Sequence, residues 1–106
     1  MPRHISILFP GQGSQHVGML DNLPIELVES YRELALKKLD FDLVEIINKG
    51  PEEVLNKTSI TQPAILFTSY IYYKHIVKIT NLKPKLMCGH SLGEYSALVN
   101  SNSISF

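Results

Sequence analysis

The sequence has little of several features that mark particular classes of protein. Its 106 residues include one cysteine, no tryptophan and a formal net charge of zero. A single cysteine cannot form an internal disulfide, so we expect a reducing compartment, a cytoplasmic location and a buried core role for Cys88. Without excess positive charge, binding to nucleic acid or to an anionic membrane surface has no electrostatic basis. No apolar run approaches the roughly 18 residues that cross a bilayer, and no signal-peptide pattern begins the chain. We therefore expect no nucleic-acid partner and no membrane.

Glycine is also scarce, but it is concentrated at two places. The first is Pro10-Gly11-Gln12-Gly13-Ser14, which directly follows the β-branched and apolar run at residues 5–9, a predicted buried strand. This loop lacks the Gly-Lys-Ser/Thr ending of a P-loop, and His16 stands where the dinucleotide fingerprint needs its third glycine. Nucleotide binding through either motif is excluded. What remains is a loop after a strand, with backbone N–H groups that glycine leaves uncovered.

The second concentration of glycine is Gly89-His90-Ser91-Leu92-Gly93, after the apolar strand predicted at residues 85–90. It matches the G-x-S-x-G nucleophile elbow, in which a strand turns sharply into a helix and presents a serine hydroxyl. Glycine two residues to either side of Ser91 permits close approach of strand and helix. A competing interpretation is a capping box between Ser91 and Glu94, in which the hydroxyl only satisfies a helix N-terminus. The preceding strand and both glycines favour the elbow.

The segments between the two glycine clusters have helical periodicity. A stripe of Leu27, Tyr31, Leu34 and Lys38, widened by Val28 and Ala35, predicts a helix over residues 23–38 with Asn22 as its cap. Asp42 is the expected cap of a second helix that stops at Gly50, and Pro51 opens a short third helix. Thr61-Gln62-Pro63 is expected to begin the longest helix, which runs to about Thr80 and carries Tyr70, Tyr72 and Tyr73 as core residues.

The order of elements is strand, helices, strand, tight turn and a helix over about residues 92–99. Two strands joined through helices must cross over, which predicts a parallel pair and an α/β fold. Two strands are fewer than the roughly four to six of a usual sheet. We therefore expect a partial parallel sheet with flanking helices and a strand–nucleophile elbow–helix unit. Residues 1–106 are expected to be the opening portion of a larger domain, incomplete at the C-terminus.

Three motifs taken together carry a specific resemblance. Phe9-Pro10-Gly11-Gln12-Gly13-Ser14-Gln15, Thr61-Gln62-Pro63-Ala64 and Gly89-His90-Ser91-Leu92-Gly93-Glu94-Tyr95 occur in this order. With this spacing the chain resembles the malonyl-CoA:acyl carrier protein transacylase family over its whole length. The resemblance implies the N-terminal portion of an acyltransferase domain with an α/β-hydrolase-like fold.

The resemblance also implies a two-step acyl transfer in fatty acid biosynthesis. Ser91 would be the nucleophile that takes a malonyl group from coenzyme A and passes it to the pantetheine thiol of acyl carrier protein. The backbone N–H groups of Gln12 and Leu92 would form the oxyanion hole, and His90 would support the substrate site near them. No cofactor and no metal are implied, because malonyl-CoA and the carrier protein are both substrates. The implied full enzyme is a cytoplasmic monomer.

Two parts of the implied mechanism have no match in this sequence. The family's histidine base and its carboxylate-binding arginine both come after the elbow, beyond Phe106. The histidines present are His4, His16, His75 and His90, and the two arginines, Arg3 and Arg32, are expected at the surface. We therefore expect weak or no activity from this portion alone. Two alternatives stay open, a serine thioesterase or esterase and a non-catalytic remnant that only binds carrier protein.

Four lysines near the end of the long helix raise a separate hypothesis. Lys74, Lys78, Lys83 and Lys85 could attract an acidic carrier protein. The alternative is an ordinary solvated face, which is the commoner role of lysines on helices.

Overall fold

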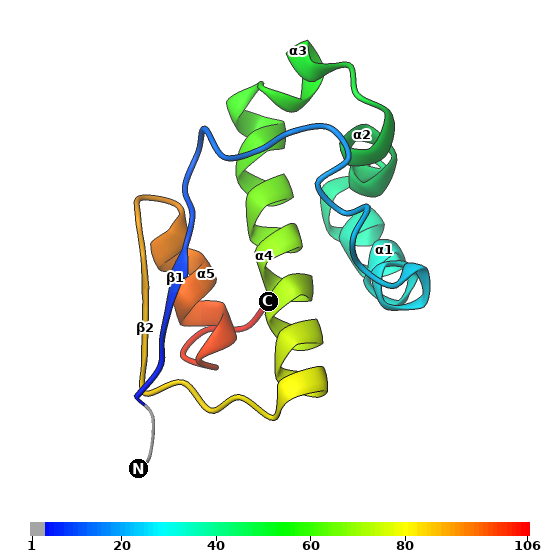
Figure 1. The fold of residues 1–106 in the computed structure, drawn as a ribbon. Helices are drawn as coiled ribbons and strands as arrows, with labels where there is room; N and C mark the ends of the chain where they lie inside the picture. The colour runs from blue at the N-terminus through cyan, green and yellow to red at the C-terminus, as the bar shows by residue number, and fades with distance from the viewer. Residues whose placement is uncertain (1–3) are drawn as a thin grey trace.

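The protein is described here by a computed structural model that covers residues 4–106, so Arg3 lies outside the described residues. The elements follow the chain in the order β1 (Ser6–Phe9), α1 (Ile25–Leu39), α2 (Leu43–Lys49), α3 (Glu52–Leu55), α4 (Thr58–Thr80), β2 (Leu86–Gly89) and α5 (Gly93–Asn100). Figure 1 shows α4 as the central rod, with the two strands and α5 on one side and α1 and α2 on the other. The predicted α/β fold is confirmed.

The two strands form a parallel pair, as the helical crossover between them requires. Ser6 pairs with Leu86 at the start of the strands, and Phe9 pairs with Gly89 at their end. Helix α5 packs on both strands. The carboxyl ends of both strands therefore meet at one edge, so the loop after β1 and the elbow after β2 leave the sheet together.

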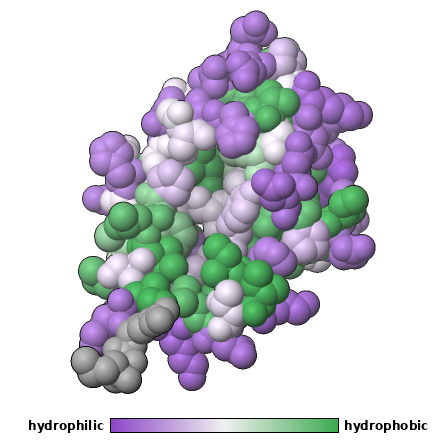
Figure 2. Space-filling model, in the orientation of Figure 1, coloured by the Kyte–Doolittle hydropathy of each residue, from purple (hydrophilic) through white to green (hydrophobic). Residues whose placement is uncertain are grey.

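The expectation that the strand at residues 5–9 is fully buried is wrong. Leu8 and Leu86 lie on the same face of the two-stranded sheet, its outer face, and are 75% and 59% exposed. Phe9, on the opposite face, is buried. Strand side chains alternate between faces, and within residues 4–106 only the face toward α5 is covered. Cys88 shares the outer face and is half-buried rather than a core residue. Figure 2 shows an apolar surface at the lower left, where Figure 1 has the two strands.

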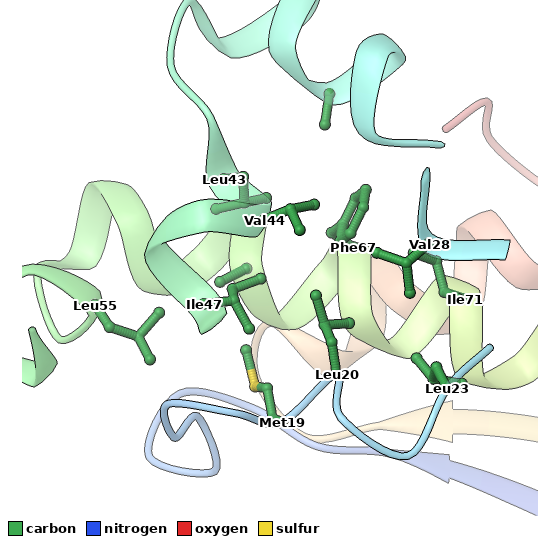
Figure 3. Close-up of a cluster of buried hydrophobic side chains, with 12 residues drawn as sticks. Met19, Leu20, Leu23, Val28, Leu43, Val44, Ile47, Leu55, Phe67 and Ile71 are labelled. Atoms are coloured by element: carbon green, nitrogen blue, oxygen red, sulfur yellow. The ribbon is translucent and has the colours of Figure 1, made fainter. Parts of the chain in front are cut away.

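The main core lies on the other side of α4. Phe67 and Ile71 on α4 face Val44 and Ile47 on α2, as Figure 3 shows. The same buried cluster takes residues from the segment before α1, from α1 itself, from the start of α2, from α3 and from α4: Met19, Leu20, Leu23, Val28, Ala35, Leu43, Leu55 and Ala64. The segment between β1 and α1 is thus anchored by its own apolar side chains. This fixes the far end of the loop that follows β1.

Helix boundaries and faces agree with expectation only in part. Asp42 caps α2 by accepting a hydrogen bond from the Glu45 N–H at 3.2 Å, as predicted. The predicted cap of α1 by Asn22 is wrong, because Pro24 occupies that position and no side chain caps the helix. The predicted stripe on α1 is confirmed at Val28 and Ala35, which are buried, but it is wrong at Leu34, which is 40% exposed.

The long helix α4 begins three residues before the predicted Thr61, at Thr58. Pro63 therefore lies inside its second turn. Proline has no N–H there to bond the carbonyl of Ser59, which is an exposed residue. The buried Thr61 hydroxyl donates to the Leu55 carbonyl and fastens this first part of the helix to α3. Side-chain anchoring, rather than a local start signal, sets this boundary.

The three tyrosines of α4 pack against other elements, but each is half-buried and is not a core residue as predicted. Tyr72 donates its hydroxyl to the Met19 carbonyl at 3.1 Å. Tyr73 lies against Phe9 with ring centroids 6.2 Å apart. Tyr70 stacks on Phe106 at 4.4 Å, and its ring also meets the edge of Tyr31.

Candidate active site

The turn from β2 into α5 places Ser91 in an unusual backbone conformation. Its φ is +56°, in the left-handed region that costs a non-glycine residue about 1–2 kcal/mol. The Glu94 N–H bonds the Ser91 backbone carbonyl at 3.0 Å, and no side-chain hydrogen bond caps α5. The capping-box interpretation is therefore wrong. A strained serine at a strand-to-helix turn is the geometry of a nucleophile elbow.

The glycines around Ser91 are required by close backbone contacts. A Cβ on Gly89 would lie 2.0 Å from the carbonyl carbon of Gly93, and a Cβ on Gly93 would lie 2.2 Å from the Phe9 carbonyl oxygen. A Cβ on Gly11 would lie 2.5 Å from the His90 carbonyl oxygen. Glycine at these three positions allows the start of α5 to contact the end of β1, and the glycine-rich loop to contact the elbow.

The two predicted oxyanion donors border this junction. Leu92 is the residue that precedes α5, so its N–H is one of the amides that a helix start leaves without an internal partner. Gln12 lies in a turn held by Ser14, whose N–H and hydroxyl both donate to the Gly11 carbonyl, at 3.3 and 2.8 Å. Among residues 4–106, neither the Gln12 N–H nor the Leu92 N–H has a hydrogen-bond partner. An amide N–H without an internal partner is a donor suited to stabilising a developing oxyanion.

His90 contributes to the elbow through its backbone. Its N–H donates to the Phe9 carbonyl at 3.2 Å, and its carbonyl accepts from the Gly93 N–H at 2.9 Å. The His90 side chain is exposed, and His16 is exposed as well, with Nδ1 3.4 Å from the Ser14 carbonyl oxygen. Within the described residues no histidine nitrogen forms a hydrogen bond with the Ser91 hydroxyl. The recorded contacts of His90 are therefore those of a backbone support for the elbow.

Arg32 has a structural role that its position on the polar side of α1 did not predict. Its guanidinium contacts the Asp42 carboxylate at 2.5 Å and the Glu29 carboxylate at 2.9 Å. The Arg32 hydrogen bond is the main reason that the pKa of Asp42 is lowered. Arg32 thus ties α1 to the residue that caps α2, and it is only about one-third exposed.

The four lysines lie away from the elbow. The Lys85 N–H donates to the Ile5 carbonyl at the opening of the sheet, whereas Ser91 follows its closing end. The four residues of β2, about 13 Å at 3.3 Å per residue, and His90 lie between Lys85 and Ser91. Lys74 places its Nζ 5.1 Å from the centroid of the Tyr70 ring. The lysines are therefore not part of the site around Ser91.

Within residues 4–106, no three histidine, cysteine, aspartate or glutamate side chains gather closely enough to hold a metal ion. In the same part of the chain, no helix combines the length and the apolar character needed to cross a membrane.

Residues 7–106 match the family described as "Acyl transferase domain". The chain belongs to this family. The match begins in β1 and takes in both the glycine-rich loop and the elbow. The resemblance inferred from the three motifs is confirmed.

Two curated relatives of this chain carry the same name. The chain is 45% identical to the malonyl CoA-acyl carrier protein transacylase of Haemophilus influenzae, across 98% of this chain and 34% of the relative. Against the Escherichia coli K12 protein of the same name, the identity is also 45%, across 95% of this chain and 33% of the relative. The chain thus spans about a third of the length of the curated relatives it matches.

Solved structures agree with the fold. An acyl-carrier-protein S-malonyltransferase from Burkholderia pseudomallei superimposes with a TM-score of 0.92 at 38% identity, covering 98% of this chain and 34% of that one. A malonyl-transacylase in complex with a type II PKS acyl-carrier protein superimposes with a TM-score of 0.86 at 45% identity, covering 92% and 33%. The parallel pair, the elbow and the helices are thus the arrangement of acyltransferase domains.

Proposed function

We propose that this chain carries the nucleophile and the oxyanion hole of a malonyl-CoA:acyl carrier protein transacylase. In the first step Ser91 Oγ attacks the malonyl thioester carbonyl, and coenzyme A leaves as its thiol. In the second step the pantetheine thiol of acyl carrier protein attacks the malonyl ester and restores the serine hydroxyl. No cofactor takes part, since both thioesters are substrates, and the reaction belongs to fatty acid synthesis in the cytoplasm.

The observation that carries this proposal is the backbone of Ser91, held at φ +56° between β2 and α5. Such strain persists only where surrounding contacts impose it, and here Gly89 and Gly93 allow those contacts. Ser91 directly precedes Leu92, and the loop that contains Gln12 approaches the elbow where Gly11 lies against the His90 carbonyl. Each oxyanion donor is worth about 2.7–4 kcal/mol in the transition state. The names of the relatives favour malonyl transfer over hydrolysis.

We also propose that residues 1–106 form an incomplete catalytic set. A serine hydroxyl is a weak nucleophile unless an adjacent base accepts its proton. A malonyl carboxylate needs a cationic partner, and bidentate arginine is the usual one. Arg32, the arginine within residues 4–106, is already paired with Asp42 and Glu29. The remaining two thirds of the relatives' length would supply both groups.

Mass spectrometry tests the assignment of the nucleophile. The chain is incubated with malonyl-CoA, with and without added imidazole as an external base, and the adduct is mapped by peptide sequencing. We expect slow, partial loading of one malonyl group on Ser91, faster with imidazole and absent in Ser91→Ala. No adduct on Ser91 under either condition would refute its role as nucleophile. Rapid, stoichiometric loading without imidazole would instead refute the incomplete catalytic set.

The acceptor is tested separately. Chain preloaded on Ser91 is mixed with holo-acyl carrier protein, with apo-carrier protein as the matched control that lacks the pantetheine thiol. We expect malonyl transfer only to the holo form. Release of free malonate at the same rate with either form would favour the thioesterase alternative. Carrier-protein binding without any turnover would favour the non-catalytic remnant.

A further inference from the structure

The loop after β1 is held to a distant part of the chain by side-chain hydrogen bonds. The Gln12 side-chain amide donates to the Thr58 hydroxyl at 3.3 Å, and the Gln15 side-chain amide donates to the Asn56 side-chain oxygen at 2.8 Å. Both partners belong to the junction between α3 and α4, more than forty residues further along the chain. In Figure 1 this junction lies at the same end of the molecule as the loop.

Gln15 uses both ends of its carboxamide. While Nε2 reaches Asn56, Oε1 accepts the Gly13 N–H at 2.7 Å. Gly13 has φ +110° and no atom near the place of a Cβ, so packing does not hold this residue. Its conformation is instead held by the hydrogen bond that the Gly13 N–H donates to Gln15 Oε1. The Gly13 peptide unit directly follows Gln12, so a change at Gly13 also turns the Gln12 backbone.

Asn56 is a firm anchor for this contact. It ends α3, and its own N–H donates to the Glu52 carbonyl at 2.8 Å. The preceding Leu55 is completely buried and its carbonyl accepts the Thr61 hydroxyl of α4. The position of the Asn56 backbone is therefore set by its hydrogen bond within α3 and by the burial of Leu55, and neither involves the glycine-rich loop.

From these contacts we propose that Gln15 and Asn56 are positioning residues for the oxyanion hole. The Gln15–Asn56 pair fixes the Gly13 peptide, and through it the direction of the Gln12 N–H beside Ser91. The inference rests on the proposed function, because it assumes that this N–H binds an oxyanion. Neither side chain needs to contact the substrate. Displacing a catalytic group by about 1 Å can lower a rate about 100-fold, so this support would act on the chemical step.

Hydrogen-bond complementarity provides the test. Gln15→Glu still accepts the Gly13 N–H, and the Asn56 amide can turn over to donate to the new carboxylate. Asn56→Asp still accepts from the Gln15 amide. The double variant places two carboxylates against each other with no donor between them, and like charges in contact repel. Asn48→Asp, at an exposed position on α2, is the matched control for added negative charge.

The functional readout is the acylation of Ser91 by p-nitrophenyl acetate, with imidazole as external base. The reaction is measured by the p-nitrophenolate that acylation releases. We expect each single variant to stay within about threefold of the parent rate constant and the double variant to fall by about 10–100-fold. Substrate affinity should change little, so the loss should appear in the rate constant at saturation. A double variant within threefold of the single variants would overturn the proposal.

A second readout does not depend on catalysis. In ¹⁵N-labelled chain the Gly13 amide should exchange slowly with solvent in the parent and in both single variants, and quickly in the double variant. The Gln12 amide shift should move in the double variant alone, with circular dichroism unchanged. If Ser91 is not acylated in the parent, the proposed function fails, and these amides still decide whether the pair positions the loop. If the Gly13 exchange rate and the Gln12 amide shift are unchanged in the double variant, the positioning role of the Gln15–Asn56 pair is refuted.

Discussion

Gly93→Ala tests how tightly the elbow is built. Gly93 is the first residue of α5, and its Cβ would lie 2.2 Å from the Phe9 carbonyl oxygen, 2.9 Å from the Phe9 carbonyl carbon and 3.0 Å from the Pro10 carbonyl oxygen. Ordinary van der Waals contact begins near 3.4 Å, so helix and strand must separate by about 1.2 Å. All three atoms are backbone and cannot rotate away. The same movement strains the bond from the His90 N–H to Phe9.

The expected loss of stability combines three contributions. Overpacking of this kind costs about 1–3 kcal/mol, and a weakened hydrogen bond costs about 0.5–1.5 kcal/mol. Replacing glycine by alanine restricts the unfolded chain and returns about 0.4–1 kcal/mol. We therefore expect Gly93→Ala to lower the free energy of unfolding by about 2–3 kcal/mol. This is a large share of the roughly 5–15 kcal/mol available to a domain.

Urea unfolding followed by circular dichroism measures this difference, provided that the m-value is unchanged. Gly13→Ala is the matched control, because its Cβ meets nothing within 4 Å while its φ of +110° disfavours alanine. That variant should lose about 1 kcal/mol from backbone strain alone. A Gly93→Ala protein within about 0.5 kcal/mol of the parent would show that the contact at Phe9 relaxes easily. The steric account of the elbow would then be wrong.

Three further predictions follow from other contacts. Ser91→Gly should be more stable to urea than Ser91→Ala by about 1 kcal/mol, because glycine adopts φ +56° without strain; equal stability would contradict the strained elbow. The pKa of Asp42 is lowered chiefly by its hydrogen bond from Arg32, so this carboxylate stabilises the fold above its unfolded pKa of about 3.9 and the contribution is lost as pH falls through the lower folded value. Asp42→Asn should therefore flatten the decline of unfolding free energy in acid, and an unaltered acid titration would contradict this. Because the lysines lie at the far end of the sheet from Ser91, Lys78→Glu with Lys83→Glu should leave carrier-protein affinity within about twofold in binding calorimetry; a larger loss would restore the docking hypothesis.

The sequence predicted the residues of the candidate site more completely than the residues that hold the glycine-rich loop in place. Ser91, Leu92 and the two flanking glycines are close neighbours in sequence, and their spacing alone specifies a strand-to-helix turn. Gln12 was assigned only through a family resemblance, because a loop eighty residues earlier has no local signal for where its N–H points. The support from Gln15 and Asn56 was missed for the same reason. Each is an ordinary polar residue whose role depends on a partner far away in the chain.

The sequence by itself determined the local elements. Short apolar runs predicted both strands and helical apolar patterns predicted the helices, since main-chain hydrogen bonding and side-chain periodicity act over a few residues. Asp42 caps the start of α2 and Gly50 caps its end, as short-range capping rules predict. The helix starts predicted from Pro63 and Asn22 were wrong. At α4 the contact of the Thr61 hydroxyl outweighed the local signal, and at α1 the packing of the preceding segment did so.

Only the tertiary structure decided how the two glycine clusters meet. Parallel pairing in register brings the ends of β1 and β2 to one edge, and contacts at Gly11, Gly89 and Gly93 then press the first loop onto the elbow. The same pairing shows which strand face is covered and leaves Leu8 in solvent. Such facts depend on distances between residues far apart in the chain, and burial patterns within one segment carry no information about them.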